Sequence, residues 1–222
     1  MMNQRPQRLL YGYFRSSCTW RVRIALGYKG LEYKTIYTSL IKGDEQSPEY
    51  AKINPCKRVP TLVDDNFTLT QSIAILEYLE EKYPEKPMLP KDLHARAQIR
   101  SLVNVIACDI FPFQNTGVLK HALIDPFRRE WAQEWIIKGF TGLEDLLKKT
   151  SGKYCYGDEF TLADCVLVPQ AFNAFVRYRV DASQFPTIKR VYENLLTIEA
   201  VHKAHPFQQP DCPPEFRELD SL

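Results

Sequence analysis

Residues 9–37 have the sequence LLYGYFRSSCTWRVRIALGYKGLEYKTIY, and the first domain can be predicted from this stretch. It begins with a short apolar run, Leu9 to Phe14, which is typical of a strand. From Ser17 to Lys29 the apolar residues recur at three- and four-residue steps, as they do along one face of a helix. Gly30 suits the left-handed position that ends many helices, and residues 31–37 are rich in β-branched and aromatic side chains. The stretch therefore predicts a strand, a helix and a second strand, with the two strands parallel.

The residues that follow complete an α/β domain. Residues 59–63 and 67–70 are short strand-like runs on either side of a turn, Asp64-Asp65-Asn66, and they predict a β-hairpin. Residues 71–83, QSIAILEYLEEKY, place apolar residues on one side and glutamates on the other, so they predict an amphipathic helix. Pro84 ends that helix because proline has no backbone N–H and clashes with the preceding turn.

A proline-rich segment separates this domain from the rest of the chain. Three of the seven residues from Pro84 to Pro90 are prolines, which is too stiff and too poor in donors for a helix or a central strand. Beyond it the periodicity is helical. We therefore predict an α/β domain over residues 1–84, a linker over 85–92 and an all-helical domain over 93–222. The predicted helices lie at about 93–120, 127–149, 161–178 and 185–197.

The whole chain has the composition of a folded globular protein. Of its 222 residues 45% are hydrophobic and 25% are charged, with a net charge of only +2, so neither nucleic acid nor a membrane surface is favoured as a partner. We find no run of about 18 apolar residues, and the basic start does not lead into a signal-peptide core. The six cysteines form no Cys-x-x-Cys pair, which favours free thiols and a cytosolic location.

One motif in the predicted helical domain indicates the start of a helix. The sequence TLAD, Thr161 to Asp164, has the spacing of a capping box, in which each of the two polar side chains satisfies a backbone N–H of the other residue. We predict that this role is structural.

The turn between the first strand and the first helix contains the main candidate site. Hydroxyls and a thiol, in Ser16, Ser17 and Cys18, lie beside arginines at the start of a helix, where backbone N–H groups have no partner in the helix. Such a turn can bind a thiolate or an alkoxide. Simple capping of the helix by serine is the alternative.

Two further segments favour binding over capping. Pro60 begins a strand without an N–H to donate, and a cis Val59–Pro60 bond would direct the Val59 backbone outward, where it could pair with an extended peptide. Gln71 and Ser72 begin the next helix and could bind a carboxylate, although capping also explains Ser72. A thiolate, a peptide backbone and a carboxylate together describe a small acidic thiol peptide, and glutathione is such a molecule.

These motifs resemble those of the cytosolic glutathione transferases, over nearly the whole chain. The resemblance rests on Val59-Pro60 before the third strand, Gln71-Ser72 at the next helix, and the Thr-x-x-Asp box in the helical domain. The Ser16-Ser17-Cys18 turn is similar to the signature of the zeta class, whose activity is maleylacetoacetate isomerisation. The resemblance implies a thioredoxin-like N-terminal domain, an all-α C-terminal domain, glutathione as cofactor and a homodimer.

The resemblance also implies roles for individual residues. Ser16 stabilises the glutathione thiolate, and Ser17 and Cys18 complete the catalytic group. Arg177 binds a substrate carboxylate, the alternative being a solvated arginine on a helix. The residues that bind glutathione are these three of the catalytic group together with Thr19, Trp20, Arg21, Gln46, Val59, Gln71, Ser72 and Asn115.

The sequence departs from the family pattern in the helical domain. Phe111 stands where the family often has a glutamine, and Thr116 and Gly117 differ from the usual pair. A phenylalanine there could tighten the pocket or favour more apolar electrophiles. Three alternatives to isomerisation stay open: conjugation of small electrophiles such as α-halo acids, a mixed-disulfide reaction at Cys18, and a noncatalytic interaction module. His202 and His205 are predicted to be surface residues, and no metal site is predicted for them and the nearby Cys212.

Overall fold

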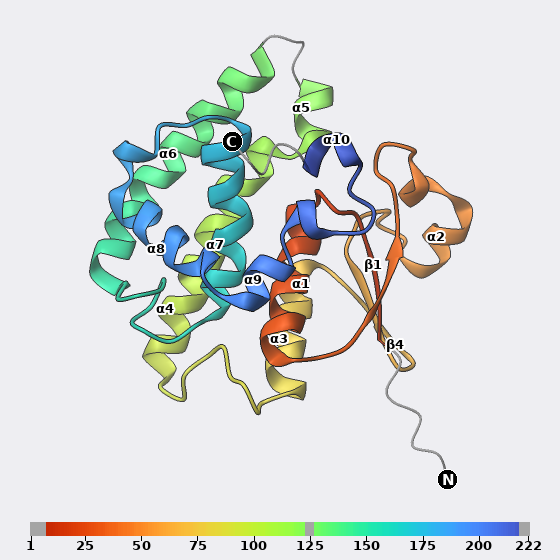
Figure 1. Ribbon diagram of the computed structural model, residues 1–222, viewed down its shortest axis with the longest axis horizontal. Helices are drawn as coiled ribbons and strands as arrows, with labels where there is room; N and C mark the ends of the chain where they lie inside the picture. The colour runs from red at the N-terminus through yellow and green to blue at the C-terminus, as the bar shows by residue number, and fades with distance from the viewer. Residues whose placement is uncertain (1–7, 123–126, 218–222) are drawn as a thin grey trace. The chain divides into compact units, whose positions relative to one another are not determined.

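The structure is a computed structural model that describes residues 8–122 and 127–217 (Figure 1). The chain divides into two compact units, one drawn from Met1–Lys86 and Glu199–Leu222 and the other from Pro87–Ile198. The basic start of the chain, on which the signal-peptide prediction depends, lies outside the described residues.

The first unit is built on a four-stranded mixed sheet. Its strands are β1 Arg8–Gly12, β2 Lys34–Tyr37, β3 Thr61–Asp64 and β4 Phe67–Thr70, in the order β2-β1-β3-β4. β1 and β2 are parallel, while β3 is antiparallel to both of its neighbours. The predicted parallel pair and the predicted hairpin are both confirmed, and the fold is thioredoxin-like.

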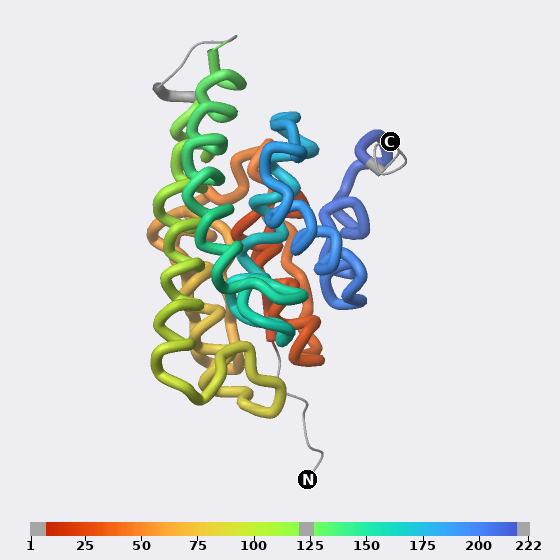
Figure 2. The backbone as a smooth tube through the Cα atoms, turned by 90° about the vertical axis from the view of Figure 1, so that its left-hand side faces the viewer, coloured from red at the N-terminus to blue at the C-terminus, as the bar shows by residue number. Residues whose placement is uncertain are grey.

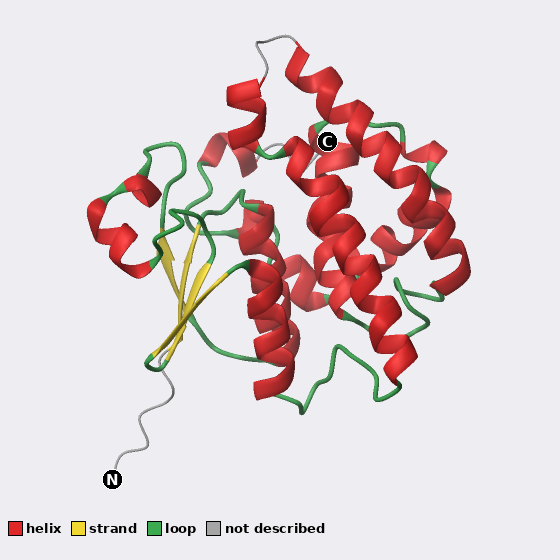
Figure 3. Ribbon diagram, turned by 180° about the vertical axis from the view of Figure 1, so that it is seen from behind, coloured by secondary structure: helices red, strands yellow, loops and turns green. Residues whose placement is uncertain are grey.

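Two helices, α1 Ser17–Lys29 and α3 Ser72–Lys82, lie side by side on one face of the sheet, and α2 Pro48–Ile53 lies on the other side (Figure 3). A 3-10 turn, η1 Asp44–Gln46, precedes α2. The polar composition around α2 gave no periodicity from which to predict a helix. Ser47 is its N-cap, accepting from the Tyr50 N–H at 3.1 Å, and a Ser-Pro pair at a helix start is the signal that could have revealed it.

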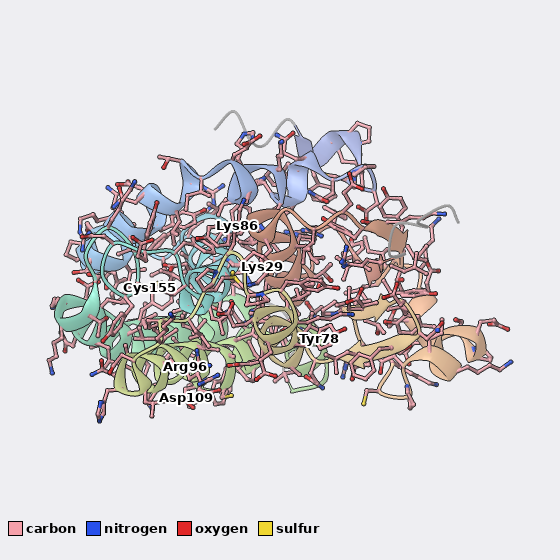
Figure 4. All side chains as sticks on the ribbon, turned by 90° about the horizontal axis from the view of Figure 1, so that it is seen from below. Lys29, Tyr78, Lys86, Arg96, Asp109 and Cys155 are labelled. Atoms are coloured by element: carbon pink, nitrogen blue, oxygen red, sulfur yellow. The ribbon has the colours of Figure 1, made fainter. Side chains whose placement is uncertain are left out.

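A buried lysine joins the ends of α1 and α3. The Lys29 ammonium donates to the Glu80 carboxylate at 2.9 Å, to the Tyr83 carbonyl at 2.8 Å and to the Lys86 carbonyl at 2.9 Å. Figure 4 shows Lys29 beside Lys86. All three ammonium protons are used, so the cost of burying this charge is offset. The same contacts fix the backbone where it leaves α3.

The C-terminal segment belongs to the first unit, whereas the predicted helical domain extended to residue 222. This segment comprises α9 Glu199–Lys203, η6 Pro206–Gln208 and α10 Pro214–Arg217. α9 packs against α1 (Figure 1), where Gly27 leaves room for Ala200. Periodicity shows that a helix has an apolar face but not which domain covers it, which is why the sequence did not separate this segment from the helices before it.

The second unit is helical, as predicted, apart from a single β-bridge between Ser151 and Gly157 within the described residues. α6 (Phe127–Thr150) runs beside the segment formed by α4 (Leu93–Asn104) and η2 (Val105–Ile110) (Figure 2). α7 (Leu162–Phe172) is buried along its whole length. The predicted helix at 93–120 is divided by the irregular turns η2 and η3 (Phe111–Gln114), with Pro112 in the latter. The elements are α4 Leu93–Asn104, η2 Val105–Ile110, η3 Phe111–Gln114, α5 Thr116–Ala122, α6 Phe127–Thr150, α7 Leu162–Phe172, η4 Asn173–Arg177, η5 Ala182–Gln184 and α8 Pro186–Leu196.

One described stretch, Leu93–Leu119, is both long and apolar. Its length and composition alone would allow it to cross a membrane, a test that core helices of soluble proteins also pass. Here the apolar side chains Ile99, Ile106 and Ile110 are fully or almost fully buried within the unit. Only 33% of the most apolar window is buried, so burial explains part of its apolar character, and one such helix is weak evidence of a membrane span.

The capping box at the start of α7 is present, as predicted. The Asp164 carboxylate accepts from the Thr161 N–H at 2.7 Å and from the Thr161 hydroxyl at 2.8 Å. It also accepts from the Cys155 N–H at 2.9 Å. Burial raises the pKa of the Asp164 carboxyl, and the hydrogen bonds from Cys155 and Thr161 oppose that rise. The aspartate thus holds the preceding loop as well as the helix.

We therefore expect Asp164→Ala to lower the free energy of unfolding by about 3 kcal/mol, because two buried N–H groups lose their acceptor. The matched control is Asp92→Ala at the exposed N-cap of α4, where one N–H, that of Ala95, loses its acceptor. That variant should lose about 1 kcal/mol. Denaturant titration of both variants measures the difference, and equal losses would contradict a role beyond capping.

Candidate functional site

The register of the sheet brings three loops to one edge. Tyr11 near the end of β1 pairs with Thr61 at the start of β3, and Thr61 pairs with Thr70 at the end of β4. Because β3 is antiparallel to both neighbours, the segment after β1, the segment before β3 and the segment after β4 meet at the same edge. These segments contain Ser16, Val59 and Gln71.

Ser16 is the N-cap of α1. Its Oγ accepts from the Thr19 N–H at 3.2 Å, so the capping alternative is realised. Capping uses a lone pair of the oxygen, however, and leaves the hydroxyl proton to be donated. The side chain is half-buried, and the first turn of α1 contains no acidic residue that would offset the helix dipole. One hydroxyl can therefore cap the helix and donate to an anion.

Arg21 connects the starts of α1 and α3. Its guanidinium is buried, and Nη1 lies 3.3 Å from the Ser72 hydroxyl and 3.9 Å from the Cys18 sulfur. The two helix N-termini therefore share one cation. The sequence placed Arg21 in the lining of the site, and the structure makes it a buried support for Cys18 and Ser72.

The segment before β3 has a fixed backbone. The Val59–Pro60 peptide bond is cis, as predicted. The Arg58 carbonyl accepts from the Tyr50 hydroxyl at 2.7 Å and from the Asn54 amide at 2.7 Å. Among the described residues no hydrogen bond uses the Val59 N–H or carbonyl. These groups are available to pair with an extended peptide.

Gln71 has a backbone conformation that L-residues rarely adopt. Its φ is 71° and its ψ is 113°, at the residue before α3. The side chain is exposed and makes no hydrogen bond to the described part of the chain. Holding a non-glycine residue there costs on the order of 1–3 kcal/mol, and such strain is concentrated at ligand sites. The exposed side-chain amide of this strained residue is therefore a candidate ligand-binding group.

Three of the proposed lining residues lie elsewhere. Thr19 and Trp20 are in the core of the first unit, Thr19 against Gly12 and Trp20 edge-on to the His205 ring at 5.1 Å. Their side chains therefore cannot reach a ligand at the surface. Gln46 is exposed on η1, where its amide donates to Glu45 at 3.1 Å, and no hydrogen bond within the described residues joins it to the Ser16 turn.

The other proposed residues belong to the second unit. Asn115 accepts from the Gly117 N–H at 2.9 Å and so begins α5. Arg177 is half-buried in η4, with its guanidinium 5.0 Å from the centre of the Tyr178 ring. The Tyr178 hydroxyl in turn donates to the Gln114 carbonyl at 3.3 Å. Phe111 and Gly117 are half-buried, and Thr116 is exposed.

No group of three or more metal-binding side chains is found in the described ranges. His205, one of the residues predicted at the surface, accepts from the Phe207 N–H through Nδ1 and packs on Trp20. His202 is exposed, as predicted, whereas His205 is half-buried. The nearby Cys212 is buried.

The fold and this edge of the sheet define a class of protein: a thioredoxin-like domain that binds glutathione, joined to a helical domain. The model of the glutathione S-transferase N-terminal domain matches residues 6–81, and the model of its C-terminal domain matches residues 125–196. The chain belongs to the glutathione S-transferase family, and its relatives place it in the zeta class.

The relatives cover nearly the whole chain. A probable maleylacetoacetate isomerase 2 of Drosophila melanogaster is 48% identical over 95% of this chain and 92% of its own length. A maleyl pyruvate isomerase, described as a bacterial zeta-class glutathione S-transferase, has a solved structure with a TM-score of 0.89 and 35% identity, covering 92% of this chain and all of its own. A maleylacetoacetate isomerase of Anaeromyxobacter dehalogenans, solved with glutathione in its active site, has a TM-score of 0.85 and 39% identity, covering 95% and 100%.

Replacing Gln71 separates backbone strain from ligand binding. We expect Gln71→Gly to keep or raise the stability, since glycine accepts a positive φ, and to weaken glutathione binding about tenfold because the amide is lost. Isothermal titration calorimetry and denaturant titration measure the two effects. Asp65→Gly, at another positive φ of 55° in the hairpin turn, is the control and should change stability alone. Unchanged affinity in Gln71→Gly would remove this residue from the site.

Proposed function

We propose that this protein catalyses the glutathione-dependent cis–trans isomerisation of maleylacetoacetate to fumarylacetoacetate. The observation that carries the proposal is the Ser16 turn, where a hydroxyl that can donate lies at a helix N-terminus with no nearby first-turn carboxylate. The names of the zeta-class relatives support the choice of substrate.

When bound, glutathione supplies a thiolate whose addition to the conjugated double bond, followed by rotation and elimination, converts cis to trans without net consumption of the thiol. The protein contributes the donors around that sulfur. Ser16 donates its hydroxyl proton, and the first turn of α1 supplies backbone N–H groups, among which that of Cys18 has no partner within the described residues. The Val59 backbone pairs with the peptide, and Gln71 and Ser72 bind its γ-glutamyl end.

The magnitudes are sufficient without a general base. A free thiol has a pKa of about 8.5, and lowering it by about two requires about 2.7 kcal/mol in favour of the thiolate. A hydroxyl that donates to an anion supplies about 1.5–3 kcal/mol, and a helix N-terminus about 0.3–2 kcal/mol. The Ser16 turn has both.

Two residues of the helical unit are proposed to bind ligands. Arg177 binds a carboxylate of the substrate, and Asn115 binds glutathione. A guanidinium suits a carboxylate because its N–H groups match the two oxygens. The Tyr178 ring holds the Arg177 guanidinium on one face and leaves its N–H edge available for that purpose.

We also propose a cytosolic homodimer that acts in phenylalanine and tyrosine catabolism. Six cysteines, all free, support a reducing compartment. The dimer and the pathway follow from the family resemblance.

Phe111 supports a second candidate function, the conjugation of glutathione to small electrophiles such as α-halo acids. A half-buried phenylalanine where the family often has glutamine makes its surroundings more apolar. Consumption of glutathione in proportion to product distinguishes conjugation from isomerisation.

The experiment supplies maleylacetoacetate with a small amount of glutathione and follows both the fumaryl product and the remaining thiol. We expect many turnovers per glutathione in the wild type, and loss of most turnover in Ser16→Ala with glutathione affinity retained within a few fold. Ser47→Ala, which removes the equivalent serine cap from α2, is the matched control and should keep full activity. Full activity in Ser16→Ala would refute the role of its hydroxyl.

Replacement of Arg177 tests how the diacid is bound. We expect Arg177→Leu to raise KM for maleylacetoacetate about 10- to 100-fold, the value of one or two charge-assisted hydrogen bonds, with little change for an uncharged electrophile. Arg177→Lys should recover part of the loss. The control is Arg179→Leu, at an exposed arginine two residues further on. An equal loss with charged and uncharged substrates would exclude carboxylate recognition.

A further inference from the structure

The backbone just before Ser16 is held by an arginine from inside α1. The Ser16 N–H donates to the Tyr13 carbonyl at 3.1 Å, which closes the turn. The buried Arg23 guanidinium donates to the same carbonyl at 3.4 Å and to the Phe14 carbonyl at 2.9 Å. Its Nε donates to the Ala204 carbonyl at 3.1 Å. Arg23 thus ties the Ser16 turn to the C-terminal segment.

An aspartate of the C-terminal segment completes this attachment. Asp211 accepts from the Phe14 N–H through Oδ2 at 2.9 Å, across 197 residues of sequence. Phe14 is almost fully buried, and its ring lies 5.9 Å from that of Phe216 in the same segment. The Phe14 N–H and carbonyl are therefore both fixed by side chains, one from Asp211 and one from Arg23. Two residues further along, this backbone becomes Ser16.

We propose that Asp211 is a positioning residue for the glutathione thiolate. This inference rests on the proposed function, because it assigns to the C-terminal segment the placement of the hydroxyl that holds the sulfur. Ser16 lies two residues after Phe14, in the short turn that leads into α1. Release of the Phe14 N–H lets this short turn move, and a hydrogen bond to an anion weakens steeply when its distance or angle changes.

Asp211 affects the pKa of the glutathione thiol in two ways, through its own charge and through the position of Ser16. The two effects have opposite signs, so they can be separated. The Asp211 carboxylate is a negative charge in the same unit as the site, and its removal alone favours the thiolate and lowers the thiol pKa. Loss of the hydrogen bond to Phe14 displaces Ser16 and raises the thiol pKa. The ionisable groups near this turn include Arg23, which interacts with Asp211 and with Tyr33. They also include Tyr13, which interacts with Arg15, Asp211 and Cys212.

Two variants of the full-length protein test the assignment. Asp211→Ala removes both charge and acceptor, and we expect the pKa of bound glutathione to rise by about one, with kcat/KM near neutral pH falling about tenfold. Asp211→Asn removes the charge but keeps an oxygen that can accept from Phe14. It should restore a thiol pKa at or below that of the wild type. The readout is the ultraviolet absorbance of the thiolate in the binary complex across pH.

Asp158→Ala controls for loss of stability. Asp158 is an exposed aspartate of the second unit that accepts one backbone N–H, from Lys153 at 2.6 Å. The Asp158→Ala variant should lower the melting temperature without changing the thiol pKa of bound glutathione. If the wild-type protein leaves the thiol pKa of bound glutathione unchanged, the proposed function is wrong. If the wild type lowers this pKa and Asp211→Ala lowers it by the same amount, the positioning role of Asp211 alone is wrong.

Discussion

The first turn of α1 has backbone N–H groups that no carbonyl of the helix can satisfy, and the arrangement around the site follows from where that helix begins. The preceding strand ends at Gly12, beside the segment before β3 and the segment after β4. A side chain at Gly12 would collide with the methyl group of Thr19 in the first turn of α1. The close approach of strand and helix is thus built into the sequence at this residue.

The inner surface of α1 is unusual because it buries charge. Arg21, Arg23 and Lys29 are each less than 10% exposed. Their partners include a hydroxyl of α3, carbonyls of the turn and the C-terminal segment, and a carboxylate with two carbonyls at the end of α3. Burial lowers the pKa of Arg23 to about 10, which still leaves it charged at neutral pH. Each cation therefore joins α1 to a different part of the first unit.

Much of the fold could be predicted from the sequence because its signals are local. The apolar steps from Ser17 to Lys29, the hairpin turn and the capping box at Asp164 depend on neighbouring residues, and the structure has all three. The burial of Arg23 and the attachment of Asp211 to Phe14 could not be predicted. They join residues far apart in the chain, and an arginine on a helix has the same local pattern whether it faces water or a carbonyl. The placement of Thr19 and Trp20 in the core has the same origin, since the motif identified the turn but not the direction of each side chain.

The lysine at the end of α1 also limits how the chain can vary in length. Its ammonium binds the carbonyls of Tyr83 and Lys86, so the number of residues between them is set by the geometry of one cation. An insertion or deletion within these residues would leave a buried positive charge short of an acceptor. This constraint from the lysine ends at Lys86, because the chain from Pro87 onward belongs to the second unit, where the Met88 carbonyl accepts from the Leu162 N–H at 3.0 Å.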